Sequence, residues 1–148
     1  MELNNELFDK ILLDAISSPR KRMHYDLRTV AGKDTSQRML NVLMPETVIP
    51  IHRHQETSET VIVCRGAVRE VFYDAKGNKI DEFVLEAGGS CPGIQVPQGM
   101  YHTCICLVPG SVIFEAKETG RKSSVVSGSY ARSFASKITL PGTRQIQV

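Results

Sequence analysis

Residues 52–66 read HRHQETSETVIVCRG and combine candidate metal ligands with a strand signal. His52 and His54 are two residues apart, so in an extended segment both side chains point the same way, about 7 Å apart. Glu59 follows after a polar stretch that lets the chain turn, and it leads the β-branched run 60–63, which is typical of a strand. Two imidazoles and one carboxylate suit a divalent transition metal, and the set needs one more ligand.

The segment PQGMYH at residues 97–102 supplies a fourth ligand, His102. Pro97 fixes one φ angle and Gly99 allows a positive φ, so the segment predicts a turn followed by a strand with His102 near its start. A single histidine is more often a structural residue than a ligand. Here, however, three of the four histidines of the chain stand in these two segments. The sequence therefore favours metal binding over a purely structural barrel.

Together, His-x-His-x4-Glu-x6-Gly and Pro-x-Gly-x2-His resemble the two motifs of the cupin family. The chain departs from those motifs in three places. Glu46 stands where the first motif usually has glycine, and Cys106 stands where the second usually ends in asparagine. The leading glycine of the second motif, Gly88 or Gly89, is displaced by a residue or two. None of these positions is a proposed ligand, so the departures concern loop geometry rather than the metal.

The length of 148 residues predicts one domain with a core that needs no disulfide staples. The four cysteines form no C-x-x-C pair, which indicates reduced thiols in a cytosolic protein. We find neither a signal-peptide pattern nor an apolar run of about 20 residues, so we expect a cytoplasmic protein without a membrane span. The basic residues are dispersed without aromatic interleaving, so we expect no nucleic-acid partner.

The chain begins with a helical apolar stripe over residues 5–17, which Asn4 or Asn5 can cap, and continues as an irregular polar stretch over 20–37. Short β segments with Gly and Pro turns then predict an all-β jelly-roll barrel, the double-stranded β-helix of the cupins, with an N-terminal α-helix. The expected division is an N-terminal helix and irregular arm packed on the barrel (1–36), the barrel (37–118) and a basic C-terminal arm (119–148). The expected strands are 38–44, 48–54, 59–65, 67–74, 79–86, 94–96, 101–107, 111–117 and, in the arm, 137–140.

A closer resemblance is to the WbuC-type cupin-fold metalloproteins, which are associated with gene clusters for bacterial cell-surface polysaccharide (O-antigen). It covers roughly residues 5–120 and is carried by five segments: SPRKR at 18–22, QR at 37–38, MP at 44–45, FYDAKG at 72–77 and EAKETG at 115–120. The resemblance implies a single-domain metal-binding cupin and a pathway context, but no known reaction. Cupins commonly dimerise, and the apolar residues of the acid-free segment 119–148 need a surface to pack on, so we expect a homodimer.

These observations lead to two hypotheses for one metal site formed by His52, His54, Glu59 and His102. The first is an enzyme that isomerises or epimerises a sugar or related molecule with Fe, Mn, Ni, Co or Zn, or an oxygenase if the metal is iron. The second is a non-catalytic module that binds or senses a small molecule, because the same ligands serve both classes. An anionic sugar is one candidate ligand.

The candidate proton-transfer groups are Tyr101, Tyr73 and His24. Tyr101 is disfavoured because it neighbours His102 and should point to the opposite face. The candidate substrate-binding residues are Arg22, His24, Arg38 and Cys104. Cys104 shares the inward face with His102, although a small buried hydrophobe is the commoner role for such a cysteine.

Overall fold

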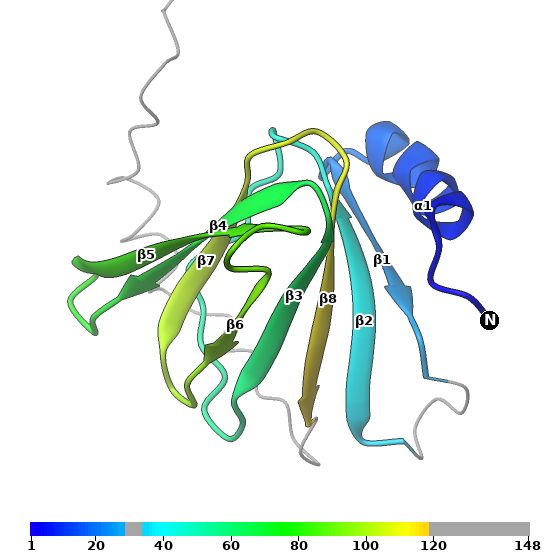
Figure 1. Cartoon of the computed structure of the whole chain (residues 1–148). Helices are drawn as coiled ribbons and strands as arrows, with labels where there is room; N and C mark the ends of the chain where they lie inside the picture. Colours follow the sequence, from blue (N-terminus) through cyan, green and yellow to red (C-terminus); the bar gives the residue numbers. More distant parts are fainter. Residues whose placement is uncertain (29–33, 119–148) are drawn as a thin grey trace, which may run out of the picture.

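The computed structural model describes residues 1–28 and 34–118, which form two antiparallel sheets and one helix (Figure 1). The larger sheet has the order β1-β2-β8-β3-β6 and the smaller has the order β5-β4-β7. This arrangement confirms the predicted jelly roll with an N-terminal helix. The elements are α1 (Asn5–Ser17), β1 (Arg22–Asp26), β2 (Ser36–Leu43), β3 (Glu59–Arg65), β4 (Ala67–Tyr73), β5 (Lys79–Glu86), β6 (Gly93–Val96), β7 (Tyr101–Cys106) and β8 (Ser111–Glu118).

Two predictions about strands were wrong. Residues 48–54 do not form a strand; only His52 pairs, in an isolated bridge with His102. Pro50 has no N–H to donate, and the carbonyls of Val48 and Ile49 accept hydrogen bonds from side chains instead of a neighbouring strand. Residues 22–26, predicted to be irregular, form β1, which pairs with β2 at the edge of the larger sheet. The predicted C-terminal arm, with its strand at 137–140, lies outside the described residues.

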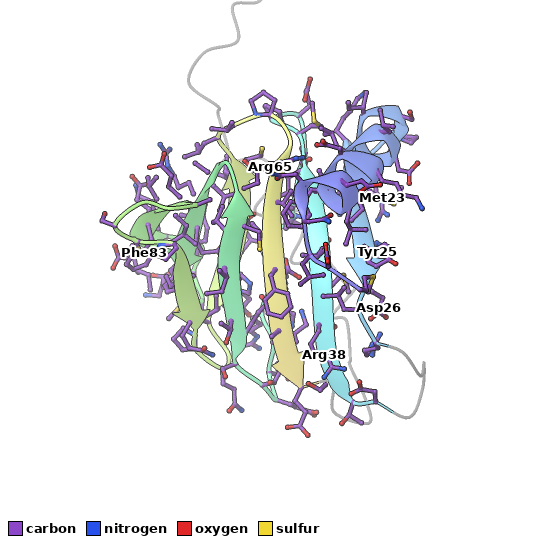
Figure 2. All side chains as sticks on the ribbon, turned by 45° about the vertical axis from the view of Figure 1, so that its right-hand side comes forward. Met23, Tyr25, Asp26, Arg38, Arg65 and Phe83 are labelled. Atoms are coloured by element: carbon purple, nitrogen blue, oxygen red, sulfur yellow. The ribbon has the colours of Figure 1, made fainter. Side chains whose placement is uncertain are left out.

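Helix α1 packs on the outer face of the larger sheet (Figures 1 and 2). Asn4, one of the two residues predicted to cap the helix, is the cap: its side chain accepts a hydrogen bond from the Leu7 N–H at 3.1 Å. The buried contact joins three residues of α1 to three of β2 and β8: Phe8, Ile11, Ala15, Leu40, Val42 and Val112. Among the described residues, no helix has the length and apolar character needed to cross a membrane.

The main core lies between the two sheets. Alternate residues of the strands point into it, as the period of two requires. Its buried members are Leu43, Val61, Val63, Val68, Phe72, Leu85, Val96, Cys104, Cys106 and Ile113. Because β2 alternates, Leu43 faces this core while Leu40 and Val42 face α1. Polar side chains also stand at several inward positions, and they form the site described next.

Candidate metal centre

Four side chains that are distant in sequence converge inside the barrel: His52, His54, Glu59 and His102. One potential ligand atom from each lies within 4.8 Å of the others. Glu59 begins β3 in the larger sheet, whereas His102 lies on β7 in the smaller one. His52 and His54 belong to the connection between β2 and β3. The structure thus brings together all four predicted ligands from both sheets and one connection.

Backbone hydrogen bonds hold the histidine-bearing connection against β7 and the turn before it. His52 and His102 exchange two of them, with N···O distances of 3.0 Å and 2.8 Å. The Gly99 N–H donates to the His54 carbonyl at 2.7 Å, and Gly99 has a φ of 77°, which glycine adopts without strain. The predicted turn at 97–100 therefore fixes both His54 and His102.

The orientations of His52 and His102 suit metal binding through Nε2. His52 Nδ1 donates to the Pro50 carbonyl at 2.9 Å, and His102 Nδ1 donates to the Met100 carbonyl at 3.0 Å. A carbonyl oxygen can only accept, so the proton of each neutral ring stays on Nδ1 and leaves the Nε2 lone pair free. His102 Nε2 lies 3.3 Å from Glu59 Oε2, and His54 Nε2 lies 3.5 Å from the same oxygen. Imidazole nitrogens around one carboxylate oxygen fit a divalent transition metal.

The pKa values of three of these residues, His52, His102 and Glu59, are shifted by their burial and mutual contacts. Burial lowers the pKa of His52 to about 4, so its ring is neutral near pH 7. Burial also opposes the charge of His102, but the Glu59 carboxylate, the Met100 carbonyl and Glu70 together raise its pKa. For Glu59, burial favours the neutral form, yet the close contacts with His102, His54 and the Lys117 ammonium group keep its pKa well below the usual range. Glu59 is therefore anionic, which suits a candidate ligand of a divalent ion.

Lys117 on β8 is a fifth polar side chain in this cluster, and the sequence analysis did not identify it. The β3–β8 register pairs Thr60 with Ala116, which sets Glu59 beside Lys117. Lys117 Nζ donates to Glu59 Oε1 at 2.6 Å and to His54 Nε2 at 3.1 Å. A cation thus already contacts two of the four candidate ligands, which shows that the cluster favours positive charge.

Two further carboxyl groups, those of Glu70 and Glu115, occupy inward positions near the cluster. Glu70 is 1% exposed, and its Oε1 lies 4.0 Å from His102 Nε2. Burial raises the pKa of Glu70 to about 8. Burial also raises the pKa of Glu115, and Glu59 raises it further. The sequence did contain a signal for Glu115 and for Lys117. Both follow Ile113 at alternate positions of a strand, and Ile113 faces the core, so their side chains point inward too.

The structure does not bring the four predicted substrate-binding residues together. Cys104 is buried in the core beside Glu70, its cross-strand partner, outside the four-residue group. Arg22 donates to the Val48 carbonyl at 2.6 Å, and His24 is exposed on the edge strand β1. Arg38 lies on the face of β2 that packs on α1, away from the cluster (Figure 2). It pairs with Asp34. Tyr101 packs under the exposed Arg53, whose guanidinium carbon lies 4.7 Å from the ring centroid.

Comparisons with known proteins find one matching family and several solved structures of similar fold. The family DUF6016, described as a domain of unknown function, matches residues 3–85, which include three of the four candidate ligands. Among curated proteins, none matches the sequence. KdgF from Halomonas sp. superposes with a TM-score of 0.53 at 18% identity, over 71% of this chain and 84% of that one.

Two other solved structures match over smaller shares of their own length. The capsular polysaccharide assembling protein CapF from Staphylococcus aureus gives a TM-score of 0.59 at 17% identity, over 72% of this chain and 30% of CapF. A recombinant oxalate oxidase in complex with glycolate gives 0.55 at 18% identity, over 72% of this chain and 54% of that one. These neighbours are cupins, and at this level of identity the likeness shows a shared fold. The narrower resemblance to the WbuC-type proteins stays a prediction.

Proposed function

The chain belongs to the DUF6016 family, and we propose that it is a metal-binding cupin in which His52, His54, Glu59 and His102 hold one divalent transition ion. The observation that carries the proposal is the convergence of four ligand atoms within 4.8 Å. The Nδ1 hydrogen bonds of His52 and His102 support it, because they leave Nε2 to bind the metal. Fe, Mn, Ni, Co and Zn all accept this ligand set.

The four ligands would leave one or two coordination positions open to a small molecule. A bound divalent ion supplies a Lewis acid that polarises an oxygen of that molecule. The ligand that we propose is a sugar or related molecule of bacterial surface polysaccharide synthesis. Two observations support this class: the resemblance to the WbuC-type proteins and the likeness to CapF, a capsular polysaccharide assembling protein.

Metal analysis of untagged protein, purified without chelators, tests the proposal. We expect close to one equivalent of a transition metal in the wild type, and less than a tenth of an equivalent in His54→Ala. His24→Ala is the matched control, because His24 is exposed on β1 and outside the cluster. The idea fails if the wild type holds less than a tenth of an equivalent after reconstitution, or if His54→Ala holds as much metal as His24→Ala.

Two kinds of activity are consistent with this centre. One is isomerisation or epimerisation of the sugar, or oxygenation if the metal is iron; the other is binding without turnover. Glu59 is a ligand and cannot easily serve as a general base as well, so an enzyme would need a second residue for proton transfer. Liquid chromatography with mass spectrometry, applied to metal-loaded protein and a panel of nucleotide sugars, separates the two activities. A new chromatographic peak of unchanged mass supports an isomerase or epimerase, a new mass supports an oxygenase, and saturable binding without product supports the module.

We also propose that the chain forms a homodimer to which residues 119–148 contribute. These residues lie outside the described structure, so the proposal rests on their apolar content and on the cupin resemblance. Sedimentation of the full chain at tens of micromolar tests the dimer, and a monomer there contradicts it. A chain ending at Gly120 tests the contribution of the last segment, and an unchanged dimer excludes that contribution.

A further inference from the structure

The two carboxylate oxygens of Glu59 have different partners, because Lys117 contacts only one of them. Oε1 accepts the ammonium hydrogen bond at 2.6 Å, while Oε2 lies 3.3 Å from His102 Nε2 and 3.5 Å from His54 Nε2. Oε2 is thus the oxygen placed to bind a metal together with the histidines. Lys117 holds the other oxygen away, so Glu59 would bind as a monodentate ligand and leave a coordination position free.

The second contact of Lys117 cannot persist in the metal-bound protein. Lys117 Nζ donates to His54 Nε2 at 3.1 Å, and this is the atom that faces Glu59 Oε2. Its single lone pair cannot serve an ammonium proton and a metal at once. Metal binding would therefore release one N–H of Lys117 inside the site, where the side chain is only 14% exposed. A released donor in such a place needs a new acceptor.

The contacts of Lys117 point to an anionic acceptor. Glu59 Oε1 would still accept one N–H of the ammonium group, and apart from Glu59 and His54 no side chain of the described residues accepts a hydrogen bond from Lys117. A carboxylate makes the strongest hydrogen bond with an ammonium group, and a divalent ion beside that group attracts the same negative charge.

We propose that Lys117 makes the metal centre selective for small carboxylate-bearing ligands, such as sugar acids, whose carboxylate accepts a hydrogen bond from the ammonium group beside the metal. This inference rests on the proposed metal centre and names the ligand class of that site. It also makes Lys117 a competitor of the metal at His54. Replacing Lys117 with an uncharged residue should therefore weaken anion binding without weakening metal binding.

Spectroscopic titration of cobalt-loaded protein tests this inference. D-glycerate and glycerol form a matched pair, since they differ by a carboxylate in place of a hydroxymethyl group, and the cobalt absorption bands report what binds the ion. We expect the wild type to bind glycerate at least tenfold more tightly than glycerol. In Lys117→Met, glycerate should bind about tenfold more weakly, the loss expected for one charge-assisted hydrogen bond. Lys117→Arg, which keeps the cation, should retain the preference.

Lys79→Met is the control, because it removes the same charge from an exposed lysine paired with Glu82 on β5. It should match the wild type. The inference is overturned if Lys117→Met binds glycerate within twofold of the wild type, or if the wild type does not prefer glycerate to glycerol. The second criterion needs no variant, so it holds even if Lys117→Met loses its cobalt. If the wild type binds no cobalt, the proposed metal centre itself fails.

Discussion

The carboxyl group of Glu70 is buried in an unfavourable environment near the candidate metal centre. It is 1% exposed, and neither oxygen receives a hydrogen bond from a nitrogen or oxygen donor of the described residues. Burial raises its pKa from 4.5 to about 8. Between these values the unfolded chain ionises while the folded chain keeps the proton. The free energy of unfolding therefore falls as the pH rises through this window.

Replacing Glu70 with Gln should remove this pH dependence, because the amide resembles the protonated acid and cannot ionise. We expect the variant and the metal-free wild type to differ little at pH 5. At pH 8 the variant should be more stable by a few kcal/mol, given about 1.4 kcal/mol for each pKa unit. Urea unfolding at both pH values measures the difference, and Glu86→Gln on the exposed side of β5 is the control. A gain at pH 8 no larger than that at pH 5 would refute the account.

At this scale the cluster of four candidate ligands could be predicted because their residue types and spacing are local features of two short segments. The residues around them are set by strand register instead. Lys117 reaches Glu59 only because β8 pairs with β3, and Glu70 meets Cys104 only because β4 pairs with β7. Arg38 was expected near a substrate, but the alternation of β2 places it on the other face, beside Asp34. The pairing register of two strands cannot be predicted from either strand segment alone.

The same distinction applies to the elements. The bounds of β3 and β5 match their predictions to the residue, since each strand is bordered by polar or turn residues. The strand β1 was missed because it lies at an edge, where three of its five residues are exposed and no apolar alternation is required. The predicted strand at 48–54 was wrong because a single bridge and several side-chain hydrogen bonds satisfy its backbone.

The turn between β3 and β4 provides a prediction at the level of elements. Gly66 has a φ of 74°, and a Cβ added there would lie 2.5 Å from Ser111 Oγ. That hydroxyl is buried; it accepts from the Ala67 N–H at 3.1 Å and lies 2.9 Å from the Ala67 carbonyl. Gly66→Ala should therefore lose stability both from the positive φ and from displacement of Ser111, in total about 2–4 kcal/mol.

Gly88→Ala separates these two contributions. Gly88 has a φ of 73°, but a Cβ there would meet no atom within 4 Å. It should cost only about 1 kcal/mol, the effect of the backbone conformation alone. Chemical denaturation of both variants gives the comparison. Equal losses would mean that the Ser111 contact contributes nothing, and the turn would then depend on φ only.

At the scale of the whole molecule, the candidate ligands connect the two sheets. Glu59 belongs to the larger sheet, His102 belongs to the smaller, and His52 and His54 lie on the connection that bridges to His102. A jelly roll of this kind was predictable because its strands are short and separated by Gly and Pro turns. The position of the candidate site between the two sheets could not be predicted, because it depends on how the sheets face each other.

A metal bound to residues of both sheets should stabilise the whole domain, because the unfolded chain does not hold the four ligands together. At a free ion concentration about a hundredfold above the dissociation constant, the gain is about 2.7 kcal/mol. For a domain of this size the gain raises the Tm by roughly ten degrees. Differential scanning calorimetry with cobalt, and again after EDTA, measures this increment. His102→Gln should abolish it and His24→Ala should keep it, whatever the Tm of each metal-free variant. An increment that survives in His102→Gln would place the stabilising ion elsewhere in the chain.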